Sequence, residues 1–215
     1  MRIALIHATP LSLAPIHAAF QAAWPEPVLA DLLDSSLSAD LARDGALTPA
    51  MTGRFLTLGR YVVSAGADAI LFTCSAFGPC IAAVAAAHAA MPVLKPNEAM
   101  IVAAHRMGAK RIGLVASFAP SFASMLPEFE EAAPGAVVET ALADGAMQAL
   151  AEGDAARHDA LVAGATASLR HCEVIALAQF SLARARQAAE AASGRPVLTT
   201  PDAAVAELRR RLGAA

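Results

Sequence analysis

A single thiol stands at the end of an apolar run in AILFTCSAFGP, residues 69–79. The run stops at Thr73, Cys74 and Ser75, and small residues and Pro79 follow. Pro79 suits the first turn of a helix. A cysteine that leads into a helix N-terminus meets free backbone N–H groups and the positive end of the helix dipole, which favour the thiolate. The pattern predicts a thiol that acts as an acid or a base toward a bound substrate.

The remaining cysteines and histidines form no comparable pattern. Cys80 and Cys172 are interpreted as packing residues, because free cysteine is usually buried and behaves as a small hydrophobe. The three cysteines include no CxxC pair, and the six histidines include no HxH or HExxH spacing. We therefore expect no disulfide framework, no metal site and no cofactor.

The order of segments is repeated along the chain. Short apolar runs occupy 2–8, 27–34, 69–75 and 91–96, and then 111–117, 136–143, 173–181 and 195–201. Alanine-rich helical stretches separate these runs, as expected for parallel sheets buried on both faces. We predict an α/β fold of two pseudo-symmetric lobes, each with a mostly parallel four-stranded sheet flanked by helices. The first lobe spans 1–97 and is completed by a C-terminal helix at 201–215, and the second spans 98–200.

Aligning the two halves places a different residue opposite the thiol. RIALIHA matches RIGLVAS, DAILFTCSAFG matches EVIALAQFSLA, and PVLKPNEA matches PVLTTPDA. Cys74 then falls opposite Gln179, and Lys95 falls opposite Thr199. Only one of the two equivalent positions carries a thiol.

Polar residues collect where the predicted strands end. In open parallel sheets, ligands bind beyond the carboxyl ends of the strands, so we expect a cleft between the lobes there. The substrate-binding candidates are His7, Thr9, Thr73, Ser75, Ala76, Ser117, Ser181, Thr199 and Thr200, with Cys74 and Gln179 as catalytic candidates.

Several of these residues have a second interpretation. Ser75, Ser117 and Thr200 suit helix N-caps as well as anion binding, because both roles use the same backbone N–H groups. His7 is either a general acid or a hydrogen-bonded residue at a buried strand end, and the second is favoured. Lys95 either pairs with a substrate carboxylate or is a solvated charge.

Composition excludes several classes of protein. The net charge is −3, and the longest basic run, Arg209 to Arg211, suits the last turn of a helix, so no nucleic-acid partner is expected. Hydrophobic residues make up 57% of the chain, but charged residues and prolines interrupt every apolar stretch before it reaches membrane-spanning length. The first apolar run is too short for a secretory signal. We expect a cytoplasmic protein with no membrane partner.

Five segments together resemble the aspartate/glutamate/hydantoin racemase superfamily: LFTCSAFG, RIGLVAS, IALAQFSLA, VLTTPDAAV and LLDSSLSADLARDG. The resemblance implies two similar α/β lobes with a catalytic position at the end of an equivalent strand in each. Racemases of this family use two cysteines, whereas this chain resembles a member with only the first-lobe cysteine, Cys74, and Gln179 in the second position. It also implies a homo-oligomer.

The resemblance leads to one principal function and two alternatives. We expect a cofactor-independent, racemase-like isomerase that acts at the α-carbon of a small carboxylate, such as an amino acid, with Cys74 as acid or base. The first alternative is a lyase similar to arylmalonate decarboxylase, which uses one thiol but carries it in the second lobe. The second alternative is a small-carboxylate binding protein without catalysis.

Overall fold

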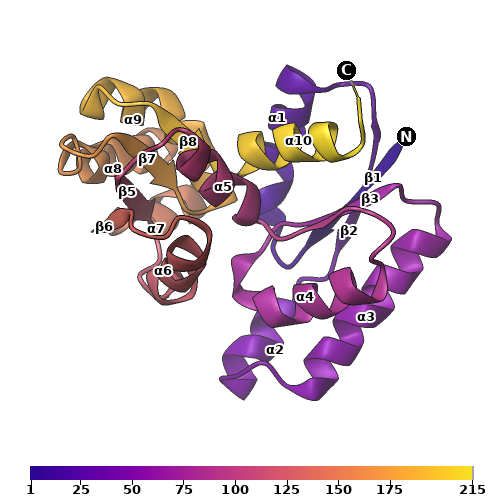
Figure 1. Ribbon diagram of the computed structural model, residues 1–215. Coiled ribbons are helices and arrows are strands. Elements are labelled where there is room, and N and C mark those ends of the chain that lie inside the picture. The colour runs from indigo at the N-terminus through magenta and orange to yellow at the C-terminus, as the bar shows by residue number, and fades with distance from the viewer. Residues whose placement is uncertain (215) are drawn as a thin grey trace. The chain divides into compact units, whose positions relative to one another are not determined.

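The computed structural model describes residues 1–214, and the chain divides into two compact units (Figure 1). Unit 1 comprises Met1–Pro96 and the C-terminal residues from Ala204, and unit 2 comprises Asn97–Ala203. No helix in the described part of the chain combines the length and the apolar character that a membrane span requires.

Unit 1 is built on a four-stranded parallel sheet. Its strands are β1 (Arg2–His7), β2 (Val28–Leu33), β3 (Ala69–Phe72) and β4 (Val93–Leu94), in the order β2-β1-β3-β4. Its helices are α1 (Leu13–Ala23), α2 (Ser36–Asp44), α3 (Pro49–Ser64) and α4 (Gly78–Ala87), with the 3-10 helices η1 (Pro10–Ser12) and η2 (Ser75–Phe77). Helices α3 and α4 lie on one side of the sheet and α1 on the other (Figure 1).

Unit 2 repeats this plan. Its strands are β5 (Arg111–Ala116), β6 (Val137–Leu142), β7 (Val174–Leu177) and β8 (Val197–Thr199), in the parallel order β6-β5-β7-β8. Its helices are α5 (Glu98–Arg106), α6 (Pro120–Ala132), α7 (Ala146–Ala151), α8 (Ala155–Ala167) and α9 (Arg186–Ser193), with the 3-10 helix η3 (Phe180–Ala185). The chain then continues through α10 (Thr200–Arg211), whose C-terminal part belongs to unit 1.

The predicted fold class is confirmed, and both sheets are entirely parallel. Even the register repeats, since Arg2 pairs with Val28 in the first sheet and Arg111 pairs with Val137 in the second. The central strands are buried along almost their whole length, which explains their continuous apolar sequences. The edge strands β2 and β6 instead contain no buried residue, and the order of partly and fully exposed residues is the same in both.

Two strands end earlier than the sequence pattern predicts. Strand β3 stops at Phe72 rather than at 75, and β7 stops at Leu177 rather than at 181. In both cases two residues follow the strand, and a 3-10 helix begins at the third residue. The residues that carry the chemistry therefore leave the sheet ladder and occupy a turn.

The Ser-rich segment after β2 is the helix α2, which ends at Gly45 in the left-handed conformation with φ 69°. Arg54 of α3 holds this region in place, because its guanidinium forms ion pairs with Asp34 at 2.5 Å and Asp40 at 2.6 Å. The basic run at the end of α10 also lies in a last helical turn, as predicted. There Arg209 donates a hydrogen bond to the carbonyl of Ala23 at 3.0 Å.

A group of aromatic rings fills the space between the first sheet and α3. Phe55 stacks on Phe72 with ring centroids 5.4 Å apart, and it also contacts Phe77 at 5.0 Å. All three rings are almost completely buried. Because Phe72 and Phe77 flank the turn that contains Cys74, this packing fixes both ends of the turn.

The close contact between α3 and α4 requires a glycine. A methyl group at Gly59 would lie 2.7 Å from Cγ1 of Val84, a buried residue of α4. We predict that Gly59→Ala lowers the free energy of unfolding by about 1 kcal/mol or more, since overpacking outweighs the gain in helix propensity. Urea denaturation measures this change.

Gly53→Ala provides the matched control, because Gly53 lies in the same helix with no atom within 4 Å of the added methyl group. It is expected to raise stability by about 0.5–1 kcal/mol through helix propensity alone. Equal effects of the two substitutions would show that the helices do not pack as described.

Candidate functional site

Cys74 and Gln179 occupy equivalent places in the two units. Each lies two residues beyond its strand, in extended backbone, and each precedes a 3-10 helix. Their backbone angles are similar, with φ −127° and ψ 119° at Cys74 and φ −116° and ψ 150° at Gln179. The alignment of the two halves thus corresponds to a structural equivalence.

The thiol of Cys74 is partly buried and has one hydrogen-bonding neighbour, the backbone N–H of Ala76. Burial raises the pKa of the thiol above its ordinary value, and the Ala76 N–H opposes this rise only in part. A 3-10 turn separates Cys74 from α4, which begins at Gly78, so the thiol does not sit directly on the helix N-terminus. The loss of solvation therefore outweighs the stabilisation of the thiolate that the sequence pattern predicted. In the resting protein Cys74 is a protonated thiol.

The space beside Cys74 is narrow and mostly apolar. Its walls include Leu37, Phe55, Phe72 and Phe77, together with the strand end at His7. It is too narrow to admit a water molecule as it stands. The walls on this side of the thiol therefore disfavour charge.

A buried hydrogen-bond network lies under the turn that carries Cys74. His7 is completely buried, and its Nδ1 lies 2.9 Å from both Ser12 Oγ and Thr73 Oγ1. The two hydroxyls are 2.8 Å apart, and His7 Nε2 lies 3.0 Å from Asp31 Oδ1. Burial lowers the pKa of His7, while its hydrogen bond to Asp31 acts in the opposite direction. The network ties the end of β1 to Thr73, the residue before the thiol.

This network has no counterpart in unit 2. The registers of the strands place Ala116 opposite His7 and Thr140 opposite Asp31. Thr73 corresponds to Ala178, which follows β7 as Thr73 follows β3. The two units therefore share a backbone plan, and only the first carries both a thiol and a buried histidine beneath it.

Both ends of the Gln179 amide are held by its own unit. Its Oε1 accepts the Ser117 backbone N–H at 3.1 Å, and its Nε2 donates to Ser121 Oγ at 2.8 Å. A primary amide does not ionise near neutral pH, so Gln179 is unsuited to the role of an acid or a base. It fixes the loop after β5 instead.

The other predicted residues fall into two groups. Thr9 and Thr199 cap helices, since Thr9 Oγ1 accepts the Leu11 N–H at 3.4 Å and Thr199 Oγ1 accepts the Asp202 N–H at 3.3 Å. By contrast, the hydroxyls of Ser75, Ser117 and Ser181 have no hydrogen-bond partner within residues 1–214, and the buried hydroxyl of Thr200 also has none. Ala76 contributes its backbone N–H.

Sequence reasoning did not identify Ser12, Asp31, Ser121 or Asn97. Asp31 lies within an apolar strand, where a single acidic residue in an otherwise hydrophobic run was the available signal. Asn97 is 2% exposed, and neither end of its amide has a partner among the described residues. Buried polar groups without partners are uncommon and costly, so Asn97 and Thr200 are candidates for ligand contacts.

A second cluster of polar groups lies near the start of β7. Ligand atoms of Glu139, His171 and Cys172 lie within 4.8 Å of one another. His171 Nε2 is 2.8 Å from one carboxylate oxygen of Glu139, and Arg111 contacts the other at 2.5 Å. The carboxylate is thus already neutralised by a cation, and we interpret the cluster as an ion-pair network.

Comparisons with known proteins agree on the fold. The family model described as Asp/Glu/hydantoin racemase matches residues 8–208. No curated protein matches the chain in a sequence search. Among solved structures, aspartate racemase from Picrophilus torridus has a TM-score of 0.73 at 12% identity, covering 99% of this chain and 94% of that one.

Two further structures differ in the reaction that their names describe. Allantoin racemase from Klebsiella pneumoniae has a TM-score of 0.70 at 17% identity, and the match covers 99% of this chain and 88% of the allantoin racemase. A glycine-to-cysteine mutant of arylmalonate decarboxylase in its sulfate-associated form has a TM-score of 0.70 at 19% identity. The match covers 100% of this chain and 94% of that one. At these identities the likeness establishes the fold alone.

The three thiols differ in burial, which predicts their order of reaction with iodoacetamide. Cys74 is partly exposed, whereas Cys80 and Cys172 are completely buried, so Cys74 is alkylated first. Because burial raises the pKa of the Cys74 thiol, the rate of its alkylation is low at neutral pH. This rate still increases when the pH passes 9.0, the ordinary pKa of a cysteine thiol. Peptide mass spectrometry measures each site, and a rate that levels off near neutral pH would contradict this assignment.

Burial of neutral His7 makes stability depend on pH. The lowered pKa means that the folded protein takes up this proton less readily than the unfolded chain does. The contribution of His7 to the free energy of unfolding is therefore complete above pH 6.5, the ordinary pKa of histidine. It is lost as the pH falls from 6.5 toward the lower pKa that His7 has in the folded protein. We predict a smaller loss of unfolding free energy over this range for His7→Asn, measured in urea.

His105→Asn controls for the removal of an imidazole, since His105 is exposed on α5. If His7→Asn and wild type lose stability in parallel as the pH falls, His7 is not buried in its neutral form.

Proposed function

The chain belongs to the Asp/Glu/hydantoin racemase family, and from that premise we propose that it catalyses a cofactor-independent reaction at the α-carbon of a small carboxylate, with Cys74 as the acid or base. Members of this family are isomerases by name, and a decarboxylase shares the fold. An amino acid or a related acid is the proposed substrate.

One observation supports this proposal most directly. Cys74 is the partly exposed thiol of the chain, and it lies on the turn that follows a central parallel strand. This is the edge at which open parallel sheets bind ligands. The buried network of His7, Ser12 and Thr73 anchors this turn through the side chain of Thr73, the residue before the thiol. The chain therefore carries a reactive group at the place where a substrate is expected.

The raised pKa favours the role of acid. When a substituted malonate loses carbon dioxide, the C–C bond breaks and its electron pair passes into the remaining carboxylate, which gives an enolate-like species. When an amino acid exchanges its α-proton, the thiolate form of Cys74 first takes that proton and the same kind of species results. The Cys74 thiol then gives its proton to the α-carbon, a C–H bond forms, and the resulting thiolate regains a proton from solvent. The apolar walls around Cys74 favour this direction, because they disfavour the thiolate in the resting enzyme.

Hydrogen-bond donors are needed to hold the carboxylate and to stabilise the negative charge that develops on it. Beside Cys74 in unit 1 we propose the hydroxyl of Ser75 for this role, because it has no protein partner within residues 1–214. In unit 2, the hydroxyls of Ser117, Ser181 and Thr200 are likewise without a partner in this range and are that unit's own candidates for ligand contacts. Asn97 joins the candidates of unit 2, because its buried amide is equally without a partner within residues 1–214.

The position of Gln179 favours the lyase alternative among one-thiol reactions. Racemisation by two groups needs an acid and a base on opposite faces of the α-carbon, and an amide serves as neither. The Gln179 amide is also occupied by Ser117 and Ser121. Proton transfer on one face is sufficient for decarboxylation of a substituted malonate, or for exchange of an α-proton without inversion.

Proton NMR in deuterated water tests the proposal with a panel of amino acids, hydantoins and substituted malonates. We expect wild type to incorporate deuterium at the α-carbon of one substrate or to release its carboxyl group. Cys74→Ser is expected to lower this rate by about 10²-fold or more, because a hydroxyl is a much weaker acid than a thiol. Product configuration then shows whether one face or both faces are protonated.

Cys80→Ser is the matched control, since Cys80 is completely buried and plays no part in the proposed chemistry. Activity that survives in Cys74→Ser would exclude the thiol as the proton carrier. Saturable binding without turnover for the entire panel would instead favour a carboxylate-binding protein.

A further inference from the structure

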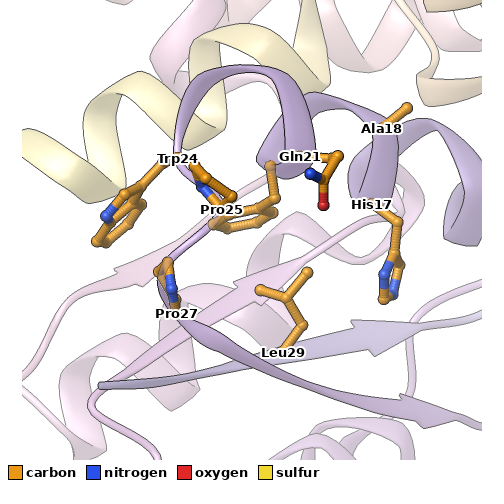
Figure 2. Close-up of a pocket in the computed structure, with 8 residues that line it drawn as sticks. His17, Ala18, Gln21, Trp24, Pro25, Pro27 and Leu29 are labelled. Atoms are coloured by element: carbon orange, nitrogen blue, oxygen red, sulfur yellow. The ribbon is translucent and has the colours of Figure 1, made fainter.

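A pocket of about 320 Å³ lies in unit 1 between α1 and β2 (Figure 2). Its size falls within the range of small-molecule sites. None of its lining residues borders the narrow space beside Cys74. The pocket is therefore separate from the site proposed above.

Flat and apolar side chains form most of the pocket wall. Figure 2 shows Trp24, Pro25 and Pro27 grouped toward one end, with Leu29 rising from β2 beneath α1. Trp24 is 4% exposed and contacts the ring of Phe20 with centroids 5.9 Å apart. These two rings back the pocket, and the accessible side chains of Pro25, Pro27 and Leu29 offer the surface against which a planar ring can pack.

Two polar side chains project from α1 at the other end of the pocket. His17 and Gln21 are one helical turn apart, and both line the pocket (Figure 2). His17 uses Nε2 to contact both oxygens of Asp31, at 3.0 and 2.9 Å. Its Nδ1 and the amide of Gln21 have no hydrogen-bond partner within residues 1–214. They supply a donor and an acceptor for a ligand that has both groups.

The pocket is connected to the catalytic turn by consecutive hydrogen bonds. Asp31, which holds His17, also contacts His7 Nε2 at 3.0 Å. His7 Nδ1 contacts Thr73 Oγ1 at 2.9 Å, and Thr73 immediately precedes Cys74. A ligand that fixes His17 therefore acts on one end of a chain of contacts whose other end positions the thiol.

We propose that this pocket is a second ligand site for a small planar aromatic molecule with one carboxamide-like group, and that its occupation is transmitted to Cys74 through His17, Asp31, His7 and Thr73. The ring packs against Pro25, Pro27 and Leu29, next to the buried Trp24, and the polar group binds His17 and Gln21. A bound ligand hydrogen-bonds to His17, the solvent-exposed member of the network, and thereby stabilises the contacts from His17 to Thr73. The turn formed by Thr73, Cys74 and η2 then moves away from the sheet less often, so the Cys74 thiol is exposed to solvent less often.

Benzamide is the probe, and Trp24 reports its binding because it is the single tryptophan of the chain. We expect a saturable change in tryptophan fluorescence with benzamide and a much weaker one with cyclohexanecarboxamide, which has the same polar group on a non-planar ring. In the same solutions, saturating benzamide is expected to slow the alkylation of Cys74 by iodoacetamide about fivefold or more. Neither readout needs a substrate, so this inference fails or stands independently of the proposed reaction.

Two variants separate binding from transmission. Ala18 lines the pocket on the exposed side of α1, so Ala18→Phe fills the pocket and is expected to abolish the fluorescence change. Ala14→Phe is its control, because Ala14 is exposed one turn earlier on α1 and does not line the pocket. Thr73→Val cuts the network at its far end, so the fluorescence change should remain while the effect on Cys74 is lost.

Three results would overturn the proposal. The first is the absence of a saturable fluorescence change with benzamide. The second is an undiminished change in Ala18→Phe, which would place the binding elsewhere. The third is an alkylation rate that benzamide leaves unchanged in wild type, or slows equally in Thr73→Val, which would exclude transmission through the network.

Discussion

The parallel pairing of β1 with β3 is the constraint on which the first unit depends. It carries the carboxyl ends of both strands to one edge of the sheet, so His7 and Thr73 meet although 66 positions separate them in the chain. Once buried there, the imidazole must find hydrogen-bond partners, because a buried polar group without them costs about 1–3 kcal/mol. Ser12, Thr73 and Asp31 supply these partners and thereby fix the residue that precedes Cys74.

The two units show how one backbone plan can serve two purposes. Strand order, register and the turn after the third strand are the same in both. The side chains are not the same, because the second unit replaces the thiol by Gln179 and directs that amide to Ser117 and Ser121. The first unit therefore holds a group that can exchange a proton, whereas the second uses the same position for a structural hydrogen bond.

Burial decides the resting state of the thiol. Cys74 lies beside aromatic and aliphatic walls, and the single N–H that reaches it, from Ala76, does not offset the loss of solvation. A protonated thiol at a strand end is suited to deliver a proton to carbon after a bond to that carbon has broken. The same apolar setting limits the access of solvent to the thiol.

The sequence by itself determined the fold class, the repeat and the place of the thiol. Continuous apolar runs identify strands buried on both faces, and matching segments such as RIALIHA and RIGLVAS reveal the duplication. These signals are local, so they can be recognised without the structure. The equivalence of Cys74 and Gln179 also follows from the alignment of the two halves.

Only the tertiary structure decided which polar residues meet. Asp31 and Ser12 join His7 because of strand pairing and the turn at η1, and no local pattern shows that either of them contacts His7. Burial of the Cys74 turn reversed the expected direction of the thiol pKa, since side chains from α2 and α3 form part of its walls. Contacts between distant segments and the solvation that they remove are properties of the packed chain, which is why the sequence pattern alone did not contain them.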